Sequence, residues 1–201
     1  MIHVKPLSMP DVLLFEPKRF EDHRGFFSET FSRRALAAIG FDLEFVQDNH
    51  SLSSQSGVVR GLHFQSPPHG QDKLVRVTRG RILDVAVDIR KGSPNFGRHV
   101  GVELSAENWR QLLVPKGFAH GFCTLEPDCE VVYKVTDYYA PECERGILWH
   151  DPTLEIDWPV TPEAAIVSTK DAALPPFEDF VSPFFHEPEM PSMHLVSGGV
   201  S

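Results

Sequence analysis

The sequence feature that most constrains the fold is an alternation of apolar and polar side chains between residues 73 and 90. In the first run Val75 and Val77 are set against polar neighbours, and a second run follows Gly80. A spacing of two residues is the period of a β-strand whose faces meet different surroundings. One face of the second run consists of Leu83, Val85, Val87 and Ile89, and the other carries Asp84 and Asp88. The pattern predicts two strands paired as a β-hairpin.

The loop before this alternation, residues 66–71, reads SPPHGQ. Its two prolines disfavour helix and its glycine permits unusual backbone angles. We expect this loop to hold His63 and Lys73 near opposite ends of one concave surface.

Composition favours a mostly β protein with one main domain. The chain has 201 residues, and its 17 prolines and 14 glycines separate short apolar runs, as in a sandwich or barrel. After Phe180 the sequence becomes rich in Pro, Ser and Gly and loses its alternation. We therefore expect a domain over residues 1–180 and a flexible tail over residues 181–201.

Charge and cysteine content exclude several classes of partner. The net charge of −9 disfavours binding to nucleic acid or to an anionic membrane, for which basic clusters are needed. Three cysteines without metal-site spacing favour reduced thiols over disulfides or zinc. No apolar run approaches a membrane span, and the N-terminal residues do not resemble a secretory signal. We expect a soluble, cytoplasmic protein.

Two predicted strands carry polar side chains that the residues alone do not explain. Gln47 and Asn49 share a face of the run 45–51, which indicates either a polar cavity or a frayed edge strand. Tyr133 lies between Val131 and Val135 on one face of the run 130–136, where packing alone would account for it.

The N-terminal part contains a predicted strand and a predicted short helix. Residues 26–31 alternate so that Phe27, Glu29 and Phe31 share a face, and an isolated glutamate there is usually solvated. Ser32 is placed to cap a helix over residues 33–39, with Gly40 ending it.

A second histidine-bearing segment, residues 113–122, reads LVPKGFAHGF and corresponds to the first. Two Gly/Pro turns that each lead into a strand with a histidine suggest the two half-motifs of a cupin barrel. The ordered segments RGLHFQ, QDKLVRV, VPKGFAHGF, VYKVTDYY and ERGILWHDP are more specific than either turn. With them the chain resembles the dTDP-4-dehydrorhamnose 3,5-epimerase family, from the N-terminus to about Phe180.

This resemblance implies a fold, a reaction and an assembly. The fold would be a cupin barrel, a double-stranded β-helix or jelly roll, with a few short helices. The reaction would invert C3 and C5 of dTDP-4-dehydro-6-deoxy-D-glucose to give dTDP-4-dehydro-L-rhamnose, without metal or other cofactor. The family also pairs barrels as homodimers, so that the N-terminal segment of one chain reaches the site of its partner.

The resemblance further implies a set of substrate-binding residues: Arg24, Glu29, Gln47, Asn49, Arg60, His120, Tyr139, Glu144 and Lys170. Tyr139 would lie against the thymine base, and Tyr138 is the second candidate for that position.

The chemistry of the reaction assigns roles to the remaining side chains. Inversion next to a ketone needs a base, a group that holds the enolate oxygen, and an acid on the opposite face. His63 suits the base, because an imidazole is partly neutral near neutral pH. Asp171 matches the family's position for the carboxylate that orients it. Lys73 could stabilise the enolate oxygen, and Tyr133 could return the proton.

Three alternatives stay open at this point. A metal-dependent cupin normally has a His-x-His pair, but here Gln65 follows His63 at that spacing, so a metal site would have to combine His63, His69 and His120. A noncatalytic sugar-binding cupin would not need the histidine–aspartate pair. An epimerase acting at C3 or C5 alone, or a ketoisomerase on a related sugar nucleotide, would share most of these residues.

Overall fold

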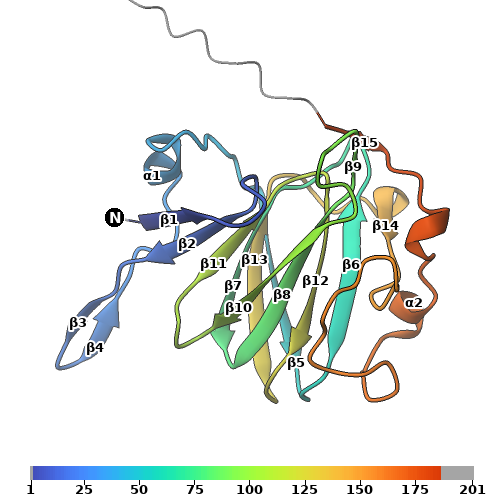
Figure 1. Cartoon of the computed structure of the whole chain (residues 1–201). Coiled ribbons are helices and arrows are strands. Elements are labelled where there is room, and N and C mark those ends of the chain that lie inside the picture. The colour runs from blue at the N-terminus through green and yellow to red at the C-terminus, as the bar shows by residue number, and fades with distance from the viewer. Residues whose placement is uncertain (1, 187–201) are drawn as a thin grey trace, which may run out of the picture.

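The computed structural model of the chain describes residues 2–186. Two antiparallel sheets face each other (Figure 1). The six-stranded sheet has the order β1 (Ile2–Pro6), β2 (Leu13–Pro17), β11 (Gln111–Val114), β7 (Lys73–Arg79), β13 (Cys129–Val135) and β5 (Gln47–Ser53). The five-stranded sheet has the order β10 (His99–Ser105), β8 (Arg81–Asp88), β12 (Phe118–Thr124), β6 (Val59–Gln65) and β14 (Glu144–Gly146).

The remaining elements are short. Antiparallel strands β3 (Phe20–Asp22) and β4 (Gly25–Phe27) form a hairpin, and β9 (Arg90–Lys91) pairs in parallel with β15 (Phe184–Phe185). The helices are α1 (Arg33–Ala37), α2 (Thr169–Ala172) and the 3₁₀ turns η1 (Pro141–Cys143) and η2 (Phe177–Asp179). Between residues 2 and 186 no helix is both long enough and apolar enough to span a membrane.

The predicted hairpin of residues 73–90 is wrong, although both strands exist. β7 pairs with β11 and β13, whereas β8 pairs with β10 and β12 in the other sheet. Gly80, with φ of 74°, turns the chain from one sheet to the other, and a Cβ on it would lie 2.6 Å from the Cys129 sulfur. Alternation defines the faces of a strand but not its partners, so it could not distinguish a hairpin from this corner.

The predicted faces of β8 are confirmed. Val85 and Val87 pack in a cluster on the outer face of the five-stranded sheet, and Asp84 and Asp88 are fully buried. Ile82 and Ala86, which share the face of the two aspartates, belong to the core between the sheets.

The core between the sheets fills only part of the interior. Its members come from both sheets and include Leu112, Val75, Leu104, Phe118 and Phe122. Elsewhere the inner faces carry polar side chains, and these surround a cavity.

The outer face of the five-stranded sheet is covered by the C-terminal part of the chain. Phe64 of β6 packs edge-to-face against Phe180 and Phe184, at 5.6 and 6.0 Å between ring centroids. The structured part therefore continues past the expected boundary at residue 180, because β15 and its contacts extend to His186. The rest of the predicted tail, residues 187–201, lies outside the described residues.

The N-terminal helix is confirmed in a shorter form. Ser32 caps α1 by accepting a hydrogen bond from the amide of Ala35 at 3.3 Å, and the helix ends at Ala37. The predicted strand 26–31 is wrong beyond Phe27, where β4 ends. Phe26, within β4, packs edge-to-face against Trp109, with ring centroids 4.8 Å apart.

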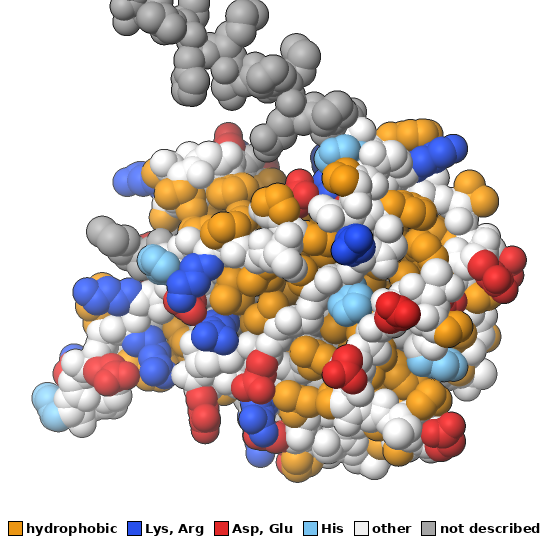
Figure 2. All heavy atoms as spheres, viewed as in Figure 1, with side chains coloured by type: hydrophobic (Ala, Val, Ile, Leu, Met, Phe, Trp, Pro, Cys, Tyr) orange, Lys and Arg blue, Asp and Glu red, His pale blue; other side chains and the backbone are white. Residues whose placement is uncertain are grey.

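The β3–β4 hairpin projects from the body of the protein (Figure 1). Phe20 and Phe27 on it are 51% and 71% exposed. In Figure 2, viewed from the same side, Lys and Arg side chains gather at this end of the molecule. The hairpin is thus an arm with exposed aromatic rings at a basic end of an otherwise acidic protein.

Candidate active site

A β-bulge in β6 directs two polar side chains into the interior. His63 is opposite His120 of β12, and Arg60 is opposite Phe122, so three steps along β6 match two along β12. Residues three apart in a regular strand point to opposite faces, but the extra residue puts Arg60 and His63 on the same side. Gly61 makes this possible with φ of 121°, since a Cβ there would lie 2.6 Å from the Cα of Gly121.

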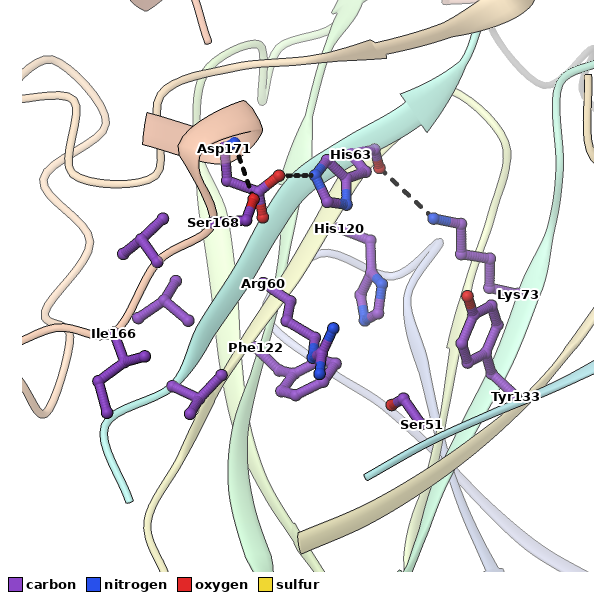
Figure 3. A pocket seen from close by; sticks show the side chains of 13 residues that line it. Ser51, Arg60, His63, Lys73, His120, Phe122, Tyr133, Ile166, Ser168 and Asp171 are labelled. Carbon is purple, nitrogen blue, oxygen red and sulfur yellow. Dashed lines mark hydrogen bonds and ion pairs between the residues drawn. The ribbon is translucent and has the colours of Figure 1, made fainter. Parts of the chain in front are cut away.

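The cavity between the sheets has two adjoining parts of about 490 and 120 Å³. His63, Lys73 and Tyr133 line both parts. The larger part is also lined by Ser51, Arg60, His120, Phe122, Ile166, Ser168 and Asp171 (Figure 3). The smaller part reaches Gln47, Asn49, Tyr139 and Glu144 at the rim. The polar face of β5 therefore lines a cavity, which decides between the two interpretations of its sequence.

His63 and Asp171 form a hydrogen-bonded pair. Asp171 is buried at the start of α2, and its Oδ1 lies 2.8 Å from His63 Nε2. Its other oxygen accepts a hydrogen bond of 3.1 Å from the amide of Gly61, so the bulge also positions the carboxylate. Burial alone raises the pKa of Asp171, but the hydrogen bonds from His63 and Gly61 outweigh it and the net pKa lies below its usual value. The ionised carboxylate thus holds a proton on Nε2 and leaves Nδ1 as the basic nitrogen.

Lys73 and Tyr133 belong to the opposite sheet from His63. The ammonium of Lys73 lies 3.4 Å from the carbonyl oxygen of His63. Burial lowers the pKa of Lys73 to about 8, against the opposing effect of the negative charges of Asp84 and Glu144. Burial also raises the pKa of Tyr133, so its phenol keeps its proton at neutral pH.

A second histidine–aspartate pair lies beside the first. His120 Nε2 is 2.7 Å from Asp84 Oδ1, and the side chain of Asp84 is fully buried. His120 is the cross-strand neighbour of His63. The two imidazoles therefore share one wall of the cavity (Figure 3).

The rim is tied together around Glu144. Its carboxylate accepts a hydrogen bond of 2.7 Å from the hydroxyl of Tyr139 and lies 2.5 Å from the ammonium of Lys170. Burial raises the pKa of Glu144, but the contacts with Lys170 and Tyr139 outweigh this effect, and the net pKa lies below the usual value. Gln47 accepts a hydrogen bond from the amide of Tyr139 and donates one to Asn49. Tyr138 does not line either part of the cavity.

Three of the predicted substrate-binding residues do not line the cavity of their own chain, and of these only Lys170 contacts its rim, through Glu144. Arg24 is exposed on the β3–β4 hairpin, where it pairs with Asp22 at 2.6 Å, and Glu29 is exposed just after that hairpin. Neither lines either part of the cavity.

The histidine set of the metal-site alternative does not converge. His69 lies 3.1 Å from Asp137 and does not line the cavity with His63 and His120. The amide of Gln65 is engaged by backbone, since it donates to the carbonyl of His69 and accepts from the amide of Ala140, each at 2.8 Å. Within residues 2–186 no cluster of three His, Cys, Asp or Glu side chains could hold a metal ion.

Three polar residues in or beside the site were not predicted as such. Ser51 continues the polar face of Gln47 and Asn49, so the period of two could have identified it. Ser168 lines the cavity and caps α2, accepting a hydrogen bond of 3.0 Å from the amide of Asp171. Asp84 was placed on the correct face of its strand, but nothing in the sequence linked it to His120.

Comparison with known proteins agrees with this geometry. Residues 6–179 match the family described as dTDP-4-dehydrorhamnose 3,5-epimerase. A curated member from Shigella flexneri is 54% identical over 171 residues, which cover 85% of this chain and 93% of that protein.

Two similar solved structures hold nucleotide ligands. The Bacillus anthracis enzyme with TDP and PPi bound has a TM-score of 0.85 and 50% identity, and the match covers 88% of this chain and 99% of that one. The Legionella pneumophila enzyme in complex with dTDP-4-keto-L-rhamnose has a TM-score of 0.85 and 48% identity, covering 90% and 95%. These likenesses confirm the predicted mostly β, cupin-type jelly-roll fold.

Proposed function

This chain belongs to the dTDP-4-dehydrorhamnose 3,5-epimerase family, and we propose that its cavity inverts C3 and C5 of dTDP-4-dehydro-6-deoxy-D-glucose with His63 as the base. The observation that carries this proposal is the position of the His63–Asp171 pair on one wall of the cavity and of Tyr133 on the other. Inversion requires that a proton leave one face of a carbon and that another arrive on the opposite face.

Deprotonation uses His63 and Asp171 on the side of the five-stranded sheet together with Lys73 from the facing sheet. His63 Nδ1 takes the proton from the carbon next to the ketone, and the C–H electrons move to the carbonyl oxygen to form an enolate. Asp171 stabilises the imidazolium, and Lys73 donates a hydrogen bond to the enolate oxygen. In a gluco-configured ring the hydrogens at C3 and C5 lie on the same face, so one base can serve both carbons.

Reprotonation uses Tyr133, which lies on the six-stranded sheet opposite His63. Tyr133 gives its phenolic proton to the enolate carbon, which reforms the ketone with inverted configuration. Solvent then restores the phenol and takes up the proton held by His63. The raised pKa of Tyr133 keeps this proton available. The resemblance to the family indicates that Tyr133 serves C5.

The remaining residues of the cavity and its rim suit a sugar linked to a nucleoside diphosphate. Arg60, which is held by the hydroxyl of Ser53 at 3.2 Å, and Lys170 supply positive charge for the diphosphate, and His120 contacts the sugar. Gln47, Asn49 and Glu144 contribute hydrogen bonds at the rim, and exposed Tyr139 is available to stack on thymine. Because all three cysteines are free and buried, a reducing compartment suits the protein, and we place it in the cytoplasm.

Turnover should not depend on a metal ion. We expect the protein to convert dTDP-4-dehydro-6-deoxy-D-glucose at an unchanged rate after exhaustive chelation, because the proton transfers use only side chains and Gln65 is occupied by backbone contacts. Product formation followed by NMR, with and without chelator, tests this. Activity that disappears on chelation and returns with a divalent ion would contradict the mechanism.

The protein should be a homodimer in which the β3–β4 arm completes the partner's site. The arm carries exposed Phe20 and Phe27, and Arg24 lies away from its own cavity. Light scattering should give twice the chain mass, and we expect Arg24→Ala and His63→Asn proteins each to be nearly inactive.

Mixing these two variants tests whether Arg24 acts across the dimer. In a mixed dimer one cavity combines an intact His63 with an intact Arg24 from the other chain. After subunit exchange the mixture should therefore recover about a quarter of wild-type activity, given random pairing in a two-fold dimer. No recovery from a mixture shown to contain mixed dimers, or a fully active monomer, would contradict this arrangement.

A further inference from the structure

Asp84 is a buried carboxylate beside the cavity to which the mechanism above gives no role. It lies on β8, its side chain is fully buried, and it does not line the cavity. Its Oδ1 is 2.7 Å from His120 Nε2. Its Oδ2 is buried and has no hydrogen-bond partner among residues 2–186.

Such a group is costly unless opposite charge lies nearby. Burial removes an ionised carboxylate from water, and one of the two carboxylate oxygens of Asp84 has no hydrogen bond to replace that hydration. The neighbouring Asp88 shows the usual solution on the same face of β8. It is also fully buried, but Arg90 at 2.7 Å and Ser93 at 2.6 Å satisfy it.

The groups that lie toward Asp84 belong to the catalytic cavity. His120 of β12 forms its hydrogen bond, and Lys73 of β7 is the cation on which its charge acts. The other ionisable groups at the cavity are Arg60, His63, Asp171 and Glu144. Asp171 pairs with His63, and Glu144 pairs with Lys170 at the rim. Asp84 therefore hydrogen-bonds to one of the two side chains that can donate to an enolate oxygen, His120, and its charge acts on the other, Lys73.

We propose that Asp84 is a positioning residue that holds His120 and Lys73 as a pair of hydrogen-bond donors for the enolate oxygen. This rests on the proposed function and adds a residue to it. Oδ1 fixes the ring of His120 by accepting from Nε2, so that Nδ1 faces the cavity. The charge of the carboxylate favours the ammonium form of Lys73 despite its burial, so that Lys73 can donate a hydrogen bond to the enolate oxygen.

This role has a consequence for pH dependence. The pKa of Lys73 is about 8 with Asp84 in place, and the negative charge of Asp84 raises it toward that value. Turnover that needs the ammonium should fall as pH rises through about 8. Removing the charge of Asp84 should lower the pKa of Lys73 further and move this loss of activity to lower pH.

The test compares Asp84→Asn with Asp88→Asn, which removes an equally buried carboxylate from the same strand outside the site. Lys73 is titrated by NMR of ¹³Cε-labelled lysine, assigned with Lys73→Arg, and kcat and KM are measured from pH 6 to 10. We expect both variants to melt at lower temperature. Only Asp84→Asn should lower the pKa of Lys73 and shift the alkaline fall in kcat to lower pH. In this variant the factor by which kcat falls should be at least ten times the factor by which KM changes. Asp84→Glu, which keeps the charge, should retain the wild-type pH profile.

Equal pH profiles and equal Lys73 titrations in Asp84→Asn and Asp88→Asn would overturn the proposal and leave Asp84 a purely structural residue. If Asp84→Asn does not fold, the ¹³Cγ signal of Asp84 in the wild-type protein decides the matter, since a protonated side chain at pH 7 would also overturn it. Neither NMR measurement needs substrate. A failure of the proposed function would instead appear as a wild-type protein that does not epimerise the sugar nucleotide.

Discussion

Replacing His63 with Asn is expected to abolish removal of the α-protons, with loss of both solvent exchange and product. The amide of Asn has no basic nitrogen. Because the cavity wall is held by the bulge at Gly61 and by the pairing of β6 with β12, the fold should survive. Thermal unfolding and dTDP binding serve as controls. Near-normal exchange in this variant would show that another group is the base.

Asp171→Asn should keep the fold and lower kcat by about 10²–10⁴, the range typical of general acid–base groups. The neutral amide can accept the same hydrogen bond but cannot stabilise the imidazolium. Normal turnover would show that Asp171 is wrongly assigned as the partner of His63.

Tyr133→Phe is expected to separate proton removal from proton return. The ring should keep its packing beside Val131 and Val135, so that substrate binding and deprotonation by His63 survive. Because only the returning proton is lost, the variant should exchange substrate hydrogens with deuterated solvent faster than it forms the doubly inverted product. The difference should be greatest at C5.

Two other outcomes would change the role of Tyr133. An equal loss of exchange and of product would mean that it assists deprotonation or only positions the substrate. Unchanged product formation would reduce it to a packing residue, which is the interpretation that its strand alone first suggested.

Periodicity predicted the strands well and their arrangement poorly. The predicted faces of β8 and β13 are correct, because a period of two determines which side chains lie on the same face. The predicted pairing of β7 with β8 is wrong, because a single glycine can either close a hairpin or lead the chain from one sheet into another. What decides between them is the burial of both strands within separate sheets, which is a tertiary property.

The site shows the same division. His63, Lys73 and Tyr133 were found because they stand out on their strands and match a family pattern. Their convergence depends on the bulge at Gly61, where Arg60 and His63 reach the same side against the alternation. Asp84 was missed because its partner His120 is 36 residues away in the sequence and on another strand. Arg24 and Glu29 could be assigned only by resemblance, since their own chain places them away from its cavity.

The measurement that tests the account most directly is incubation of the wild-type protein with dTDP-4-dehydro-6-deoxy-D-glucose in deuterated water, with the label located by NMR. Abstraction by His63 and return of a solvent-derived proton at two carbons predict deuterium at both C3 and C5 of dTDP-4-dehydro-L-rhamnose. Deuterium at only one of these carbons would show a single-site epimerase. A product without deuterium, or no product, would contradict the proposed mechanism.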